Sequence, residues 1–345
     1  MRKIYFISIL ILASSFISVL AQNPSNYKIA NKFHIEGNGK WDYLSIDEAT
    51  SRLFVSHETV VNVLDVKTGQ TLATIPDTKG VHGIALATDF NKGYISCAKN
   101  DSSVTVFDLK TLKTLGKIKN DGKKPDAIMY DSFSHKVFVF NAGSNNASVI
   151  DPKTDKIIAT IPLESNPEFS VSDGKGKVFV NLEEKSMIAV INSATLKVEN
   201  NWSIAPGTEP TGLAIDKENH RLFSVCANKL MVVVDAESGK VITTLPIGGR
   251  VDGATFDPGN KRAYASCGEG QLTVIQEKDE NAFSVLESVP TMMGAKTVTL
   301  DKSTHHIYLP TAEFTPTPEP TTENPKPKGT VKPGTFMVLD IVPVQ

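Results

Sequence analysis

Short runs of β-branched and aromatic residues alternate with polar turns along the chain, with nothing of helical period between them. One pattern of two apolar strands around a turn recurs as VVNVLDVKTGQTLATI, SVTVFDLKTLKTLGKI, ASVIDPKTDKIIATI and MVVVDAESGKVITTL. Its acidic residue falls at Asp65, Asp108, Asp151 and Asp235, and Asn192 and Gln276 fill the same slot in two weaker copies. Successive spacings are 43, 43, 41, 43 and 41 residues, so the chain is built from an internal repeat.

A second series marks the strand that precedes this pattern and raises the count to seven copies. Each copy carries an aromatic residue at the same place: Phe54, Tyr94, Phe138, Phe179, Phe223, Tyr264 and Tyr308. Four strands in about 42 residues are typical of one blade of a β-propeller. We therefore predict an all-β fold, a seven-bladed β-propeller formed by residues 22–345 as one domain.

The two ends of the repeat array favour a closed ring over an open solenoid. The seventh copy contains AKTVTL, HHIYL and FMVLDI but lacks an outermost strand. An extra strand, YKIANKFHI, stands before the first full copy. We expect this N-terminal strand, around Tyr27 to Ile35, to pair into the seventh blade and close the ring.

Residues 1–21 have the pattern of a cleavable signal peptide: Arg2 and Lys3, an apolar stretch, and a small residue at Ala21. The residue directly after this point is Gln22 and not a cysteine, so we predict a periplasmic or secreted protein that is not a lipoprotein. No later segment has the roughly 20 apolar residues of a membrane span, and no membrane insertion is expected. Without Arg2 and Lys3 the chain has 34 basic and 38 acidic residues, a formal charge of −4. This charge gives no electrostatic footprint for nucleic acid.

The chain resembles the bacterial YncE-like proteins with YVTN-type repeats over essentially all of residues 22–345. The segments that carry the resemblance include DYLSIDEATSRLFVSH, GVHGIAL, TVFDLKTLK, PDAIMYD and LFSVCANKLMVVVDAESGKV. The resemblance implies an exported propeller. One such relative binds single-stranded DNA, and similar propellers occur beside haem and quinone enzymes.

Aligning the seven copies places one residue of each at the entry to the innermost strand, around one mouth of the central channel. These residues, the mouth ring, are Asp42, His82, Asp126, Glu168, Thr211, Asp252 and Lys296. The loops that leave the second strands lie on the same face and begin at His57, Cys97, Asn141, Leu182, Cys226, Cys267 and Thr311. We expect the two sets to form a polar funnel that focuses an electric field and perturbs pKa values.

The candidate ligand-binding residues at this mouth are the charged members of the mouth ring together with His57, Asn141 and Glu313. Five of them are also candidate metal ligands: His82, Asp42, Asp126, Glu168 and Asp252. Acidic residues at strand entries also serve simply to bind loop amides. The three cysteines, Cys97, Cys226 and Cys267, lack the spacing of a zinc site or a disulfide framework, and each fits a small core position.

A proline-rich segment, 315–334, interrupts the repeat with about twenty extra residues and leaves from the same face. Stiff, extended loops of this length are either excursions or functional covers, and we expect a partial cover with Glu313 and Phe314 as contacts.

No GxSxG, HExxH or Walker motif is present, and no catalytic residue is assigned. Three functions remain open. The first is a binding or scaffold protein for a small ligand, metal ion or protein partner. The second is a hydrolase or lyase of the propeller-lactonase type that uses a divalent metal. The third is single-stranded DNA binding, which needs a basic groove with stacking aromatics.

Overall fold

The computed structural model describes residues 25–99, 102–316 and 329–344. The predicted signal peptide and most of the proline-rich segment lie outside these residues. Within them, no helix is long and apolar enough to cross a membrane.

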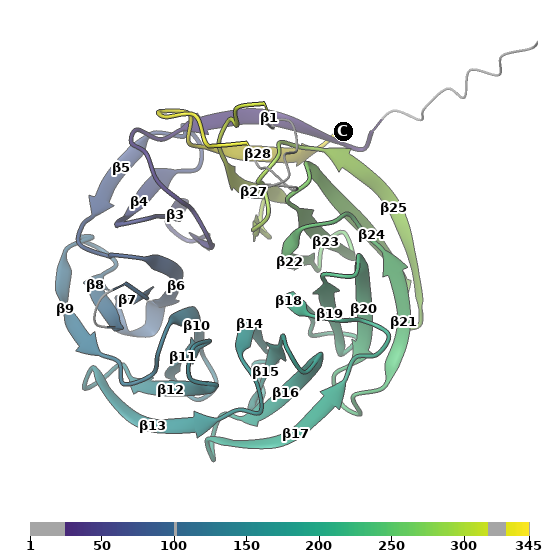
Figure 1. Ribbon diagram of the computed structural model, residues 1–345, viewed down its shortest axis with the longest axis horizontal. Helices are drawn as coiled ribbons and strands as arrows, with labels where there is room; N and C mark the ends of the chain where they lie inside the picture. Colours follow the sequence, from purple (N-terminus) through teal and green to yellow (C-terminus); the bar gives the residue numbers. More distant parts are fainter. Residues whose placement is uncertain (1–24, 100–101, 317–328, 345) are drawn as a thin grey trace, which may run out of the picture.

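The described residues form seven four-stranded antiparallel sheets arranged as blades around a central channel (Figure 1). The predicted all-β propeller is therefore confirmed. The only helical element in the described chain is a short 3₁₀ turn, η1 (Thr88–Phe90). The strands of blades one to four, from the innermost outward, are β2 (Leu44–Asp47), β3 (Arg52–His57), β4 (Val60–Asp65) and β5 (Thr71–Ile75); β6 (Val81–Ala87), β7 (Lys92–Cys97), β8 (Ser103–Asp108) and β9 (Thr114–Lys119); β10 (Pro125–Asp131), β11 (Lys136–Asn141), β12 (Asn146–Asp151) and β13 (Lys156–Pro162); and β14 (Pro167–Ser172), β15 (Lys177–Leu182), β16 (Met187–Asn192) and β17 (Lys197–Ser203).

The remaining three blades follow the same order, except that the last is completed by the N-terminal strand. Their strands are β18 (Pro210–Asp216), β19 (Arg221–Cys226), β20 (Leu230–Asp235) and β21 (Val241–Pro246); β22 (Val251–Asp257), β23 (Arg262–Cys267), β24 (Gln271–Asp279) and β25 (Ala282–Pro290); and β26 (Thr299–Asp301), β27 (His306–Thr311), β28 (Met337–Pro343) and β1 (Tyr27–His34).

The ring closes through β1, which pairs antiparallel with β28 from Tyr27 opposite Pro343 to His34 opposite Met337. This is the pairing that the sequence predicts. Tyr27 also ties the N-terminal strand to blade six, because its hydroxyl lies 2.8 Å from the Tyr264 hydroxyl and accepts a hydrogen bond from Arg262 at 2.6 Å. Closure removes the unpaired edges that an open array would expose.

The core lies in the second and third strands of each blade, where alternate side chains pack against the two neighbouring blades. The repeated aromatic residue is buried in every copy, from Phe54 to Tyr308. Contacts between blades include Phe54 with Phe107 and Phe223 with Phe256, whose ring centroids lie 5.6 and 5.2 Å apart. The hydrophobic repeat thus builds a rigid wall around the channel, and the strand entries are held at fixed positions.

The repeated acidic residue after the third strand is a turn acceptor. The Asp65 carboxylate accepts the backbone N–H groups of Lys67 and Thr68, each at 2.9 Å. Asn192 does the same with Ala194 and Thr195, which explains why an amide fills this slot in one copy. An oxygen acceptor is what the turn requires.

Candidate ligand-binding site at the channel mouth

The mouth ring lies at the starts of the innermost strands, as the repeat alignment places it. His82, Asp126, Glu168 and Asp252 are each the second residue of their strand, in β6, β10, β14 and β22. Asp42 precedes β2 by two residues. The innermost strands surround the channel (Figure 1), so these strand entries lie around one mouth.

His82 lies between two carboxylates. Its Nδ1 is 2.6 Å from Asp42 Oδ2 and 3.5 Å from Asp126 Oδ1. Burial lowers the pKa of His82, but the hydrogen bond to Asp42 and the charge of Asp126 outweigh burial and leave that pKa raised. This imidazole therefore favours its cationic form while both carboxylates are ionised.

Lys296, in blade seven, joins the charged residues of blade one to Asp252 of blade six. Its Nζ lies 3.5 Å from Asp42 Oδ1 and contacts Asp252 Oδ2. Burial raises the pKa of Asp42, but Lys296 and His82 outweigh burial and leave it lowered. Five adjacent blades, from six through seven and one to three, thus contribute a continuous arc that reads Asp252, Lys296, Asp42, His82, Asp126.

Negative charge at the end of this arc is not fully compensated. The nearest ammonium to Asp126, that of Lys124, is 3.9 Å away and well exposed. Burial raises the pKa of Asp126 to about 6, although the charge of His82 opposes this shift, and the charge of Asp42 adds to it. Glu168, in the next blade, has its pKa raised to about 9 by burial and by the charges of Asp126 and Glu183. Glu168 therefore retains its proton at neutral pH, whereas Asp126 has His82 as a charge partner 3.5 Å away and is protonated only below about pH 6.

Tyr43 belongs to this site although sequence reasoning missed it. Burial raises its pKa well above the usual value, and Asp126, Asp42 and Glu168 raise it further, so the buried phenol faces the carboxylates. Its ring packs against Phe169 at 5.2 Å. A signal was present in the sequence, because five of the other six copies place small residues at the position after the mouth ring: Gly83, Ala127, Gly212, Gly253 and Thr297.

Close approach of neighbouring innermost strands explains those small residues. A Cβ on Gly212 would lie 2.6 Å from the backbone nitrogen of Ala254, and one on Gly83 would lie 2.8 Å from Ile128 Cγ2. Only blades one and four hold a large side chain here, and these two aromatic rings pack against each other.

Two of the predicted ligand-binding residues lie on the predicted face, but their side chains point into their blades, so their prediction as ligand contacts is wrong. His57 is buried in its blade, where its Nδ1 lies 3.0 Å from Asn62 Oδ1 and its ring packs on Phe336. Asn141 is also buried and joins a blade-three network with Asn120 and Ser148. Both are the last residue of a second strand, where the pleat directs the side chain into the blade.

The cysteines do not contribute to the funnel, for the same reason. Cys97, Cys226 and Cys267 all lie in the described part of the chain and carry free, buried thiols. Burial raises the pKa of Cys226 to about 12 and that of Cys267 to about 11. They are small core residues without thiolate character.

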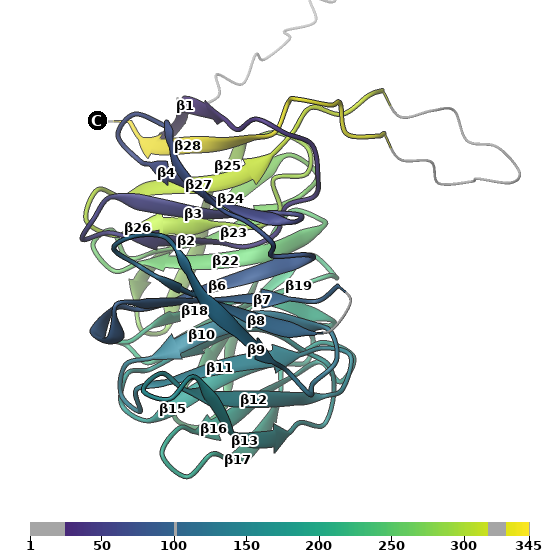
Figure 2. The same cartoon turned by 90° about the vertical axis from the view of Figure 1, so that its left-hand side faces the viewer.

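The described ends of the proline-rich segment project from one face of the ring, between β27 and β28 (Figure 2). Phe314 and Val331 pair as an isolated antiparallel bridge. Glu313 points its carboxylate at Lys332, 3.1 Å away, and is half exposed. Phe314, rather than Glu313, lines the cavity beside the mouth.

That cavity has a volume of about 450 Å³ and shares Asp42, His82 and Lys296 with the mouth ring. Its outer wall is Trp41, Phe314 and Val331. The Trp41 indole is fixed by a 3.2 Å hydrogen bond from Nε1 to the Gly294 carbonyl and by stacking on Phe336. Thus a charged arc and an apolar wall adjoin in one depression.

Three members of the arc can hold a metal ion. One ligand atom from each of Asp42, His82 and Asp126 lies within 4.8 Å of the other two. Ligand atoms around one first-row metal ion, bound at about 2.1 Å, lie roughly 3–4 Å apart. Small side-chain rotations therefore suffice, and the donor set is one imidazole nitrogen with two carboxylate oxygens.

Comparisons with known proteins give a consistent picture of the fold. No family model matches the chain. The chain is 22% identical over 279 residues to YncE of Salmonella typhimurium, which covers 77% of this chain and 67% of that protein. It is 25% identical over 232 residues to antigen Lp49 of Leptospira interrogans, which covers 60% of this chain and about half, 48%, of the antigen.

Solved structures agree at the level of the fold. Hydrazine synthase of Kuenenia stuttgartiensis superposes with a TM-score of 0.68 and 19% identity, covering 80% of this chain and 94% of that one. The structure of U3-55K gives a TM-score of 0.75 at 8% identity, covering 92% and 98%. Taken with the weak but extended likeness to YncE, the seven blades and their repeats make this chain a YncE-like seven-bladed β-propeller.

Proposed function

We propose that this protein is an exported binding propeller whose channel mouth takes up a divalent cation. The observation that carries the proposal is the convergence of one ligand atom each from Asp42, His82 and Asp126 within 4.8 Å. The distant likenesses to YncE and to antigen Lp49 support a binding or scaffold propeller in general terms. Export rests on the signal-peptide pattern of residues 1–21.

The charge balance of the mouth supports a cation. Burial raises the pKa of Asp126, and burial with neighbouring charges raises the pKa of Glu168 to about 9. A proton therefore neutralises Glu168 at neutral pH, and Asp126 takes up a proton at a higher pH than an exposed aspartate does. A cation in the same place takes over that role, so binding displaces protons and strengthens as the pH rises.

The donor set favours a first-row transition ion. Imidazole suits Zn²⁺, Cu²⁺ and Ni²⁺, whereas Ca²⁺ and Mg²⁺ prefer sets of oxygen alone. Asp42 and His82 come from blades one and two and Asp126 from blade three, so a bound ion would also join three blades. Stabilisation of the ring by the ion is the expected consequence.

A thermal-shift titration of the protein lacking its signal peptide tests the proposal. Zn²⁺ should raise the melting temperature of the wild type. At an ion concentration of one hundred times Kd, the free energy of unfolding should rise by about 2.7 kcal/mol. The gain should be larger at pH 8 than at pH 5.5, because the ligands must lose protons. Elemental analysis of the purified protein gives the stoichiometry.

The double variant His82→Ala, Asp126→Asn removes two of the three donors and should lose most of the gain. Asp108→Asn is the matched control, since it removes a carboxylate from an exposed turn of blade two. A wild type that none of Zn²⁺, Cu²⁺, Ca²⁺ and Mg²⁺ stabilises would overturn the proposal. Equal gains in the wild type and the double variant would overturn the assigned ligands.

One observation favours a second candidate, a metal-dependent hydrolase or lyase of the propeller-lactonase type. Glu168, with its raised pKa, holds a proton at neutral pH beside the proposed ion, and a positioned acid can protonate a leaving group. Zinc-dependent lactone hydrolysis that falls at least a hundredfold in Glu168→Gln would establish this activity. A zinc-dependent rate no higher than that of buffer alone would exclude it.

A further inference from the structure

The cavity beside the mouth has an apolar wall and an excess of positive charge. It holds about 450 Å³, within the range of roughly 300–1,000 Å³ typical of small-molecule sites. Trp41 and Phe314 meet edge to face with ring centroids 6.2 Å apart, and Val331 continues the wall. A flat organic group fits against such a surface better than a bare ion does.

The charges that line the cavity do not cancel. Besides His82, which is paired with Asp42, four cations reach it, Lys40, Lys99, Arg250 and Lys296, against the carboxylates of Asp42 and Glu58.

Two of the four cations are already paired. Lys99 Nζ lies 3.1 Å from Glu58 Oε1, and Lys296 lies between Asp42 and Asp252. Lys40 and Arg250 form no ion pair with any residue in the described ranges, and both are exposed at the rim. The cavity thus presents two unused cations next to an aromatic wall.

We propose that this cavity binds a small organic carboxylate with an aromatic or branched apolar body. The carboxylate lies between Arg250 and Lys40, and the body packs on Trp41 and Phe314. Arg250 supplies a planar fork that matches a carboxylate with two parallel hydrogen bonds. The site does not require the divalent cation, which is proposed for the inner side of Asp42 and His82.

Phenylacetate is a suitable probe because it combines one aromatic ring with one carboxylate. The chain has only two tryptophans, so Trp202→Phe leaves Trp41 as the sole indole reporter. Trp202 packs on Phe179 in blade four and takes no part in the cavity. Phenylacetate should change Trp41 fluorescence saturably in a buffer with chelator, and calorimetry on the wild type should give the same Kd.

Separate variants test the positive charge of Arg250 and the apolar wall formed by Phe314. Arg250→Gln should weaken phenylacetate at least tenfold, equivalent to about 1.4 kcal/mol, and Phe314→Ala should also weaken it. Lys110→Gln, which removes one positive charge from an exposed turn of blade two, should change Kd less than twofold. Phenylacetamide and 2-phenylethylamine, which lack the negative charge, should bind at least ten times more weakly than phenylacetate.

Three results would overturn the proposal: no saturable heat or fluorescence change with phenylacetate, equal affinity for phenylacetamide, or an Arg250→Gln variant that binds as tightly as the wild type. Because the chelator removes metal ions, failure here leaves cation binding at the mouth untouched. Conversely, a wild type that ignores Zn²⁺ but binds phenylacetate would overturn only the proposed cation site.

Discussion

Two repeated sets of carboxylates lie at opposite ends of the blades, and most of their members have pKa values shifted in opposite directions. Asp42 is the exception at the channel mouth, because burial would raise its pKa but Lys296 and His82 outweigh burial and lower it. The mouth set is Asp42, Asp126, Glu168 and Asp252. The turn set is Asp65, Asp108, Asp151 and Asp235. Burial raises the pKa of Asp126, Glu168 and Asp252 in the mouth set. Hydrogen bonds from backbone N–H groups lower the pKa of Asp65 and Asp108 in the turn set.

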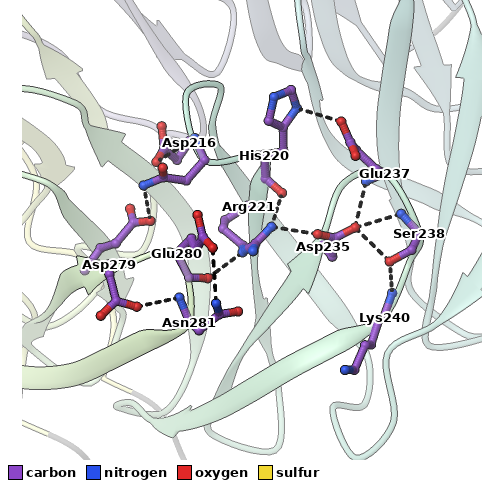
Figure 3. Close-up of polar contacts among 12 residues, drawn as sticks. Asp216, His220, Arg221, Asp235, Glu237, Ser238, Lys240, Asp279, Glu280 and Asn281 are labelled. Atoms are coloured by element: carbon purple, nitrogen blue, oxygen red, sulfur yellow. Dashed lines mark hydrogen bonds and ion pairs between the residues drawn. The ribbon is translucent and has the colours of Figure 1, made fainter.

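The surroundings of Asp235 show how the turn set is satisfied (Figure 3). Its Oδ1 accepts hydrogen bonds from the backbone nitrogens of Glu237 and Ser238, and its Oδ2 accepts one from Arg221 at 2.7 Å. Arg221 also donates from Nε to the Glu280 carbonyl in blade six, at 2.7 Å. This carboxylate is a structural acceptor that joins the turn to a buried guanidinium and to the next blade.

The difference lies in the donors available, since both sets repeat with the blades. A turn supplies two or three N–H groups to its own carboxylate. At the mouth the carboxylates face one another across a channel, with only His82 and Lys296 between them. A repeated acidic residue therefore indicates function only where the fold leaves it short of donors.

The largest effect is expected for Asp235→Ala. It removes the turn acceptor and leaves buried Arg221 without its charge partner, so unfolding free energy should fall by about 3 kcal/mol. The melting temperature should drop by roughly 4–5 °C. A calorimetric scan checks this at pH 7, and a drop no larger than that of an exposed substitution would show that the turn set does not anchor the blades.

The next largest effect is expected for Glu168→Gln. At high pH this variant should be more stable than the wild type, whereas Asp235→Ala is less stable. A folded-state pKa of about 9, raised from 4.5, means that the folded protein holds a proton that the unfolded chain has lost. Stability is therefore lost as the pH rises from about 4.5 through about 9. At pH 8, in chelator, the variant should melt roughly 2–5 °C above the wild type.

The same comparison at pH 4 is its control, because the wild-type carboxyl is then protonated in the folded state and the advantage should vanish. An equal advantage at both pH values would mean that packing, and not ionisation, causes the effect.

A smaller effect is expected in the pH dependence of the wild-type melting temperature, to which the two sets contribute in opposite pH ranges. The lowered pKa values of Asp65 and Asp108 contribute stability that is present above their unfolded values and is lost as the pH falls below about 4. The wild type in chelator should therefore melt highest near roughly pH 5, between the losses from the two sets. Melting temperatures that rise steadily up to pH 8 would contradict a mouth set with raised pKa values.

The smallest effect is expected for Asp65→Asn. An amide oxygen accepts the same N–H groups, as Asn192 does in blade four. The melting temperature at pH 7 should change by roughly 1 °C or less. A change as large as that of Asp235→Ala would show that charge, and not hydrogen-bond acceptance, is what the turn set supplies.

Much of the fold is readable from the sequence because the blade is a local unit. The aromatic residue of the second strand and the acidic residue of the turn lie within about a dozen positions of each other in each copy. Seven copies with an unpaired strand at the N-terminus then determine the ring and its closure by β1. The repeat alignment also brings Asp42, His82 and Asp126 to one mouth, because equivalent strand entries must share a face.

Only the tertiary structure decided which of these residues interact. The pleat turns His57 and Asn141 into their blades, although they lie on the predicted face. Tyr43 reaches the carboxylates because a second aromatic ring, Phe169, supports it from blade four. Likewise Arg250 meets Trp41 at the cavity only once the ring is closed. Pairings between side chains distant in sequence depend on rotamers and on the closeness of neighbouring strands, and a repeat pattern specifies neither.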